Sequence, residues 1–159
     1  KIMMCWVTET NENAHKYIRP DSYKFHSSMM GGLGIGANIS KFDDASVQIY
    51  KGHIAKYKEI RDTVQFGDQY RLLSPRESNL SAVQYINKNG KDIVIFVFLH
   101  GQKYGDFNPN VRLQGLEPDA LYQVNDLRLH GSTLMNAGLA VDLFGDFDST
   151  LIRITKLNE

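Results

Sequence analysis

The glycine cluster at residues 31–36 carries the most recognisable chemical pattern in the sequence. Residues 32–37 read Gly-Leu-Gly-Ile-Gly-Ala and fit G-x-G-x-x-A, whose glycines let a pyrophosphate lie against the backbone at a helix N-terminus. The next predicted helix begins only after Ser40, and no second β-α-β unit follows. We therefore predict that the glycines form a close-packed strand end, with nucleotide binding as an alternative hypothesis.

The other residues of chemical interest do not assemble a catalytic or metal site by their spacing. No serine lies in a nucleophile elbow, Cys5 lies in a predicted strand without a neighbouring base, and the histidines lack the spacing of metal ligands. Residues 145–148 carry two acids, but the further oxygen ligands of an EF-hand loop are missing, so we predict a turn there. The sequence predicts no catalytic residue, no metal and no cofactor within the chain.

Trp6, Thr8 and Glu9 are the candidate binding residues. They lie in and just after the apolar run at residues 2–8, which precedes a polar segment at residues 9–19. Polar loops after short apolar strands are typical of parallel α/β sheets, whose ligands bind at the carboxyl ends of the strands. Alternatively, Trp6 is a core aromatic residue and Glu9 a solvated loop charge.

Composition narrows the class of protein. The 159 residues suit one domain, or a small domain with part of another. Eighteen basic and eighteen acidic residues cancel, which argues against nucleic acid or an anionic membrane as partner. The sequence contains no run of about 18 apolar residues, so it predicts no transmembrane helix. A single cysteine favours an intracellular, cytoplasmic setting. Because the sequence begins within the pattern of a buried strand, we also expect it to be a fragment of a longer protein.

The first part of the chain predicts strands followed by one helix. We expect strands at residues 2–8 and 23–36. Ser40 as N-cap, with Asp43 and Asp44 in the first turn, begins a helix that runs to Arg61 and carries one buried stripe. His53 lies beside this stripe and is expected to be a packed or surface residue.

From residue 64 the periodicity becomes that of short strands. Apolar and polar residues alternate over residues 63–75, and this strand pattern ends at Ser74-Pro75. We therefore predict a domain boundary near residue 65. Strands at residues 81–87 and 92–100 flank Asn89-Gly90, a strong hairpin signal. Further strands are expected at residues 111–113, 120–124, 139–143 and 151–157. Short strands at this spacing predict an antiparallel β-sandwich.

Five stretches occur in an order that matches one known family. They are Met4-Cys5-Trp6-Val7-Thr8, residues 23–36, 57–61 and 64–75, and Leu113-Gln114-Gly115-Leu116. Together they resemble the carboxyl-terminal part of α-galactosidases of glycoside hydrolase family 36, over essentially the whole chain. Residues 134–139 look like the final hairpin of the same family.

The resemblance implies a mainly β fold, in which the last β/α units of a (β/α)₈ barrel are followed by an antiparallel β-sandwich. Residues 1–64 would be the remnant of the catalytic barrel, with its seventh and eighth strands and closing helix, and residues 65–159 the sandwich domain. Two strands and a helix cannot close a barrel. We therefore expect residues 65–159 to hold the fold, and the first forty residues to be poorly ordered or ordered by oligomer contacts.

The resemblance also implies a function. Family members remove terminal α-linked galactose by a retaining mechanism that uses two Asp side chains, both upstream of Lys1, so no catalytic residue carries over and the fragment is expected to be inactive. Trp6 and Glu9 remain a speculative pocket rim. The implied partner is an α-galactoside oligosaccharide, and the parent enzyme is expected to be a homo-oligomer. The alternative is a stand-alone carbohydrate-binding or assembly module that uses Tyr104, Phe107 and Tyr122.

Overall fold

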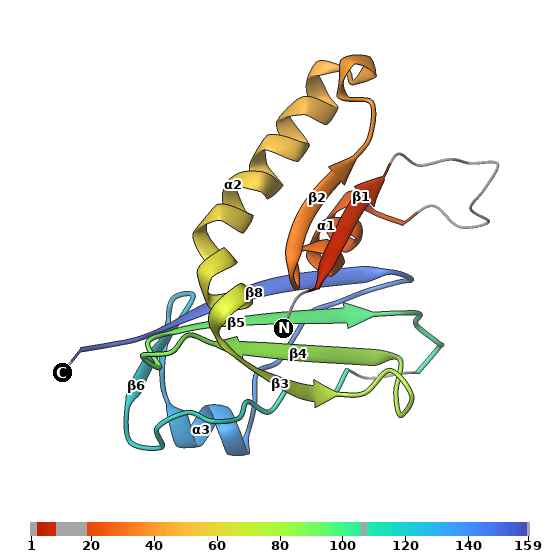
Figure 1. Cartoon of the computed structure of the whole chain (residues 1–159). Coiled ribbons are helices and arrows are strands. Elements are labelled where there is room, and N and C mark those ends of the chain that lie inside the picture. Colours follow the sequence, from red (N-terminus) through yellow and green to blue (C-terminus); the bar gives the residue numbers. More distant parts are fainter. Residues whose placement is uncertain (1–2, 9–18, 106–107, 159) are drawn as a thin grey trace.

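The chain combines a small parallel strand pair with a larger antiparallel sheet (Figure 1). The computed structural model describes residues 3–8, 19–105 and 108–158. In chain order the elements are β1 (Met4–Thr8), α1 (Asp21–Met29), β2 (Gly32–Gly36), the 3₁₀ turn η1 (Ile39–Lys41), α2 (Asp44–Phe66), β3 (Asp68–Leu73), β4 (Leu80–Ile86), β5 (Asp92–Leu99), β6 (Leu121–Val124), β7 (Leu127–His130), α3 (Gly131–Asn136) and β8 (Asp148–Lys156).

The segment predicted as one strand at residues 23–36 contains a helix and a strand. α1 occupies Asp21–Met29, and only Gly32–Gly36 forms β2, which pairs parallel with β1. The strand prediction was therefore wrong over its first half. Phe25 and Met29 are four residues apart and lie fully buried on one helix face, and Pro20 sits directly before the first turn, where its fixed φ suits a helix start.

α2 begins and ends later than the sequence predicted. Its N-cap is Asp43, whose carboxylate accepts a hydrogen bond from the Ser46 amide at 2.8 Å, whereas Ser40 lies in η1. The helix continues to Phe66 rather than ending at Arg61. Its change to strand at Gly67 falls close to the boundary predicted near residue 65, and the division of the chain into two domains stays a prediction.

The antiparallel sheet has the order β3-β4-β5-β8-β6-β7. The hairpin between β4 and β5 is confirmed: Gly90 has a φ of +72°, and the Asn87 side chain accepts hydrogen bonds from the amides of Lys91 and Asp92. β5 is buried on both faces, because Ile93, Ile95, Val97 and Leu99 enter one core and Val94, Phe96 and Phe98 enter the other. The strand therefore separates two hydrophobic cores.

One face of the sheet is covered by loops and α3. The strands predicted at residues 111–113 and 139–143 are reduced to a single bridge between Val111 and Leu139. α3 ends at Asn136 and so occupies the first half of the segment expected to form a final hairpin, which makes that prediction wrong, and β7 was not predicted. The mainly β fold with an antiparallel sheet is nevertheless confirmed. The predicted turn at residues 145–148 is present, with Gly145 at a φ of +77°.

The other face of the sheet is covered by the first part of the chain. Figure 1 shows α1 between the β1–β2 pair and the sheet, while α3 lies on the opposite side. Phe25 and Met29 of α1 join Val7 of β1 and Phe96 of β5 in one buried cluster. The sheet thus covers the inner side of α1 and the helix-facing side of the strand pair, while Met4 and Trp6 on the other side of β1 stay exposed. Among the described residues, no helix has the length and apolar character needed to cross a membrane.

Candidate functional site

The β1–β2 pair has two unlike faces. On one face the register places the side chains of Met4, Trp6 and Thr8, all exposed, beside the glycines Gly32, Gly34 and Gly36. On the other face Val7 is 1% exposed and packs in the cluster that contains α1 and α2. We call the exposed side, made of these three side chains and three glycines, the Trp6 face.

The indole of Trp6 lies across two of the glycines. A Cβ atom added to Gly34 would lie 3.0 Å from Cδ2 and Cε3 of the indole, and one added to Gly36 would lie 3.3 Å from Cε3. The glycines therefore leave space that the ring fills, which agrees with the predicted close-packed strand end. A phosphate cradle does not fit, because the ring covers the glycines and α2 begins eight residues after β2 ends, counting from Gly36 to Asp44.

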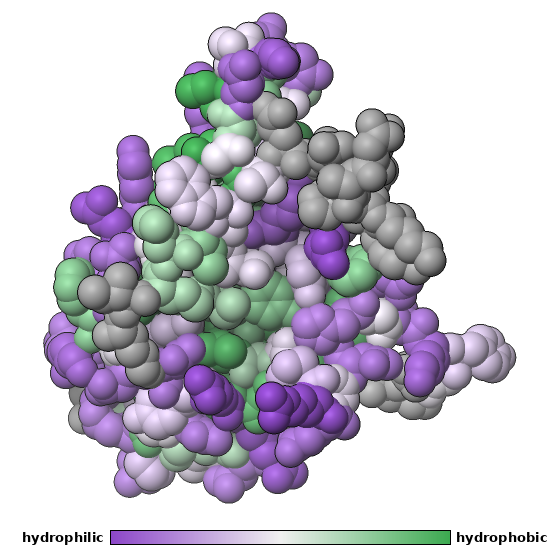
Figure 2. All heavy atoms as spheres, turned by 45° about the vertical axis from the view of Figure 1, so that its right-hand side comes forward, coloured by the Kyte–Doolittle hydropathy of each residue, from purple (hydrophilic) through white to green (hydrophobic). Residues whose placement is uncertain are grey.

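Trp6 remains accessible although it rests on the strand. Its side chain is 55% exposed, and Met4 beside it is 64% exposed. Figure 2 shows apolar and weakly polar side chains gathered in the middle of the surface that it presents, with hydrophilic side chains around them. An exposed aromatic ring with a fixed orientation suits an apolar ligand surface or the C–H face of a sugar.

Substituting Gly34 by alanine is expected to displace the indole. The added methyl group would meet the ring at 3.0 Å, which costs about 1–2 kcal/mol through overpacking. Because Trp6 is the only tryptophan in the chain, its fluorescence emission maximum reports the change directly. Gly52→Ala in α2 is the matched control, since nothing lies within 4 Å of its added Cβ. An unchanged emission maximum in Gly34→Ala would show that the indole does not rest on this glycine.

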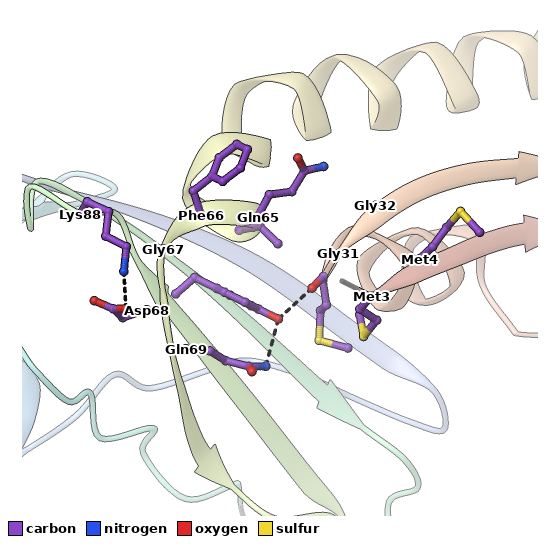
Figure 3. Close-up of a pocket in the computed structure, with 13 residues that line it drawn as sticks. Met3, Met4, Gly31, Gly32, Gln65, Phe66, Gly67, Asp68, Gln69 and Lys88 are labelled. Carbon is purple, nitrogen blue, oxygen red and sulfur yellow. Dashed lines mark hydrogen bonds and ion pairs between the residues drawn. The ribbon is translucent and has the colours of Figure 1, made fainter. Parts of the chain in front are cut away.

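A cleft of about 620 Å³ lies at the opposite, amino-terminal end of the strand pair. Figure 3 shows Gln65 and Phe66 at the end of α2, Met3 and Met4 on the other side of the cleft, and Lys88 paired with Asp68 at a distance of 2.6 Å. Ligands of parallel sheets bind at the carboxyl ends of the strands. The Trp6 face is therefore the better candidate for a site, and the cleft separates the strand pair from the sheet.

Two tyrosine hydroxyls hold the backbone where β2 begins. Tyr85 of β4 donates to the carbonyl of Met30 at 2.9 Å and accepts from Gln69 at 3.1 Å. Tyr57 of α2 donates to the carbonyl of Gly31 at 2.7 Å and accepts from Gln65 at 2.7 Å. Burial raises the pKa of Tyr85 to about 12, so the phenol is neutral and donates.

The sequence did not single out either tyrosine as a functional residue. Tyr57 lay in the predicted helix and in the family-like stretch 57–61, and Tyr85 lay in a predicted strand, but neither was given a role. Their partners are main-chain carbonyls, which every residue carries, so no side-chain pattern could have revealed the contacts.

Three of the described histidines, His26, His53 and His100, serve packing. His53 stacks on Phe25 with ring centroids 4.4 Å apart, as expected for a packed residue. His26 shares a hydrogen bond with Ser149 at 2.9 Å, and His100 bridges Tyr23 and Ser81. Burial lowers the pKa of His26 to about 4, so this ring is neutral at pH 7. Within residues 3–8, 19–105 and 108–158, no cluster of three potential metal ligands occurs.

The predicted site residues have different outcomes. Trp6 is an exposed residue of the strand pair, not a core aromatic, and Thr8 ends β1 beside it. Glu9 and Phe107 lie outside the described residues. Tyr104 is fully exposed, whereas Tyr122 is 1% exposed, so these two do not form one exposed aromatic stripe, and that part of the alternative prediction was wrong.

Comparison with known proteins found one family model and several relatives that are similar to this chain. Residues 80–154 match the family model of the glycosyl hydrolase family 36 C-terminal domain. Probable α-galactosidase C of Aspergillus flavus is 34% identical over 139 residues, covering 86% of this chain and 18% of that protein. α-Galactosidase AgaA of Geobacillus stearothermophilus is 31% identical over 136 residues, covering 84% and 19%. The chain thus spans about a fifth of the length of these relatives.

Solved structures agree in fold over nearly the whole chain. The match to the crystal structure of AgaA covers 98% of this chain and 22% of the AgaA chain, with a TM-score of 0.91 and 28% identity. A variant of AgaA in complex with stachyose matches 96% of this chain with a TM-score of 0.88 and 28% identity. Since 98% of the chain is covered, the match to AgaA includes the parallel strand pair as well as the antiparallel sheet.

Proposed function

We propose that this chain belongs to glycosyl hydrolase family 36 and is the carboxyl-terminal segment of an α-galactosidase. The observation that carries the proposal is the match to AgaA over 98% of this chain, which includes both the strand pair and the sheet. The relatives are about five times longer, and in this proposal the segment is one part of a longer enzyme. Its substrate would be an oligosaccharide with a terminal α-linked galactose.

The strand pair would supply the seventh and eighth strands of a (β/α)₈ barrel. Barrel strands present one face to helices and the other to the barrel interior. β1 and β2 already have helices against one face, whereas the Trp6 face is exposed. In this proposal residues 1–64 complete the catalytic barrel, and residues 65–159 are the domain that follows it.

The Trp6 face would then point into the barrel, where the substrate binds. Active sites of such barrels lie at the carboxyl ends of the strands, and Trp6 stands two residues before the end of β1. Its ring can pack on the apolar face of galactose, and the Thr8 hydroxyl can hydrogen-bond to the sugar. Glu9, the next residue along the chain, belongs to the same proposed pocket rim.

Catalysis would depend on groups from the upstream part of the enzyme. Retaining hydrolysis needs a nucleophilic carboxylate and an acid/base carboxyl about 5–5.5 Å apart. The two five-residue strands of the Trp6 face contain no Asp or Glu. The segment would therefore orient the sugar and exclude water, while both carboxylates come from other strands of the barrel.

The isolated 159-residue chain is expected to show no hydrolysis of an aryl α-galactoside. AgaA serves as the positive control in the same assay. The reason is that the two described strands of the Trp6 face carry no pair of carboxylates. Sustained release of galactose by the isolated chain would contradict this assignment, and Glu9→Gln would then be the first variant to assay.

A further inference from the structure

The start of β2 is fixed by side chains from elements that follow it in the sequence. Besides its bond to Gly31, the Tyr57 hydroxyl accepts a hydrogen bond from the Leu33 amide at 3.3 Å. The Gly32 amide donates to the carbonyl of Met3 at 2.6 Å. Main-chain groups of residues 30–33 are thus each held by a partner outside β2.

We propose that Tyr85 and Tyr57 are positioning residues that fix β2 beneath the indole of Trp6, and so couple the antiparallel sheet to the sugar-binding face. The proposal rests on the proposed function for its enzymatic consequence and on the described contacts for its structural one. It gives the domain after the barrel a role in setting the geometry of the site.

Tyr85 can transmit the position of the sheet because its ring cannot move freely. The side chain is 3% exposed, and its ring packs edge-on against Phe96 with centroids 6.0 Å apart. The hydroxyl therefore lies where β4 and β5 place it, and Gln69 of β3 orients it further. A shift of the sheet would move the carbonyl of Met30 with it.

The contact at Gly31 carries this position to β1. A Cβ atom on Gly31 would overlap the carbonyl oxygen of Met3, so the two backbones are in direct contact. β1 and β2 then run in register to the pair of Trp6 and Gly34. The path from the sheet to the indole therefore runs through the Tyr85 hydroxyl, the backbone contact of Gly31 with Met3, and the pairing of β1 with β2.

Tyr85→Phe tests the coupling, because it keeps the ring and removes only the hydroxyl. We expect acrylamide quenching of Trp6 fluorescence to rise about twofold, since the start of β2 opens more often. Tyr122→Phe is the matched control: Tyr122 is equally buried and its hydroxyl accepts from the Glu117 amide at 3.0 Å, but it lies in the other core. This control is expected to leave the quenching unchanged.

Equal quenching in the two variants would overturn the proposal, whatever their thermal stabilities. Tyr57→Phe is the second variant and is expected to behave like Tyr85→Phe. In a fusion where this chain replaces the corresponding segment of AgaA, Tyr85→Phe should raise KM for an aryl α-galactoside about threefold and change kcat less. An unchanged KM would also overturn the proposal. An inactive parent fusion would count against the proposed function alone, because the quenching comparison needs no activity.

Discussion

Replacing Gln84 by methionine is expected to lower the free energy of unfolding by about 2 kcal/mol. Gln84 is 0% exposed in the middle of β4. Its amide donates to the carbonyl of Gln114 at 2.6 Å and accepts from the amide of Gln114 at 3.0 Å. Methionine fills a similar volume but removes both hydrogen bonds to Gln114, each of which contributes about 1 kcal/mol.

Urea denaturation of Gln84→Met and of one control variant at neutral pH measures this change in the free energy of unfolding. Gln114→Ala is the control, because both hydrogen bonds use the backbone of Gln114 and its own side chain is exposed. We expect it to change stability by no more than about 0.5 kcal/mol. If Gln84→Met and Gln114→Ala were equally stable, the side chain of Gln84 would not be holding this loop against the sheet.

Acidification from about pH 6.5 toward pH 4 is expected to remove about 3 kcal/mol of stability through His26. Burial, followed by the positive charge of His53, lowers the pKa of His26 from 6.5 to about 4, while Asp148 opposes the shift. Between these two values the unfolded chain binds a proton that the folded chain does not. Stability is therefore complete above pH 6.5 and falls as the pH falls. Burial lowers the pKa of His53 too, which acts in the same direction.

Free energies of unfolding at pH 7 and pH 4.5 test this dependence. His26→Asn replaces the ring with an amide that can still hydrogen-bond to Ser149 but does not titrate, so the loss between the two pH values should shrink markedly. His130→Asn, at an exposed position on the sheet edge, should retain the loss seen in the unmodified chain. Parallel pH profiles for the unmodified chain and His26→Asn would contradict the assignment to His26.

Local patterns identified the elements with strong turn chemistry. Asn89-Gly90 between two apolar runs located β4 and β5 within one residue, because few turns other than a tight hairpin fit that pair. The Trp6 strand was also located, since a short apolar run before a polar segment has few alternatives.

Tertiary contacts decided the elements that the sequence misassigned. The run around Phe25 is apolar enough for a strand, but it becomes α1 because a helix can bury Phe25 and Met29 together between β1 and β8. Residues 111–113 have strand-like composition, yet they pair only through the bridge from Val111 to Leu139. The Leu113 amide instead donates to the carbonyl of Leu134 at 3.1 Å, a contact that no local pattern shows.

The candidate site could be predicted only in part, because tertiary contacts determine the rest of its geometry. Trp6 was found because strand ends of parallel sheets bind ligands. That its ring would lie on Gly34 and Gly36 depends on the register of two strands separated by α1, which the sequence alone does not fix. The contribution of Tyr57 and Tyr85 depends on main-chain partners and became visible only in three dimensions.

The most direct test of the central claim is the α-galactosidase activity of the AgaA fusion in which this chain replaces the corresponding carboxyl-terminal segment. We predict that the fusion hydrolyses an aryl α-galactoside, that AgaA truncated before this segment does not, and that Trp6→Ala in the fusion weakens the reaction at least about tenfold. A fusion that unfolds cooperatively but releases no galactose would contradict the account.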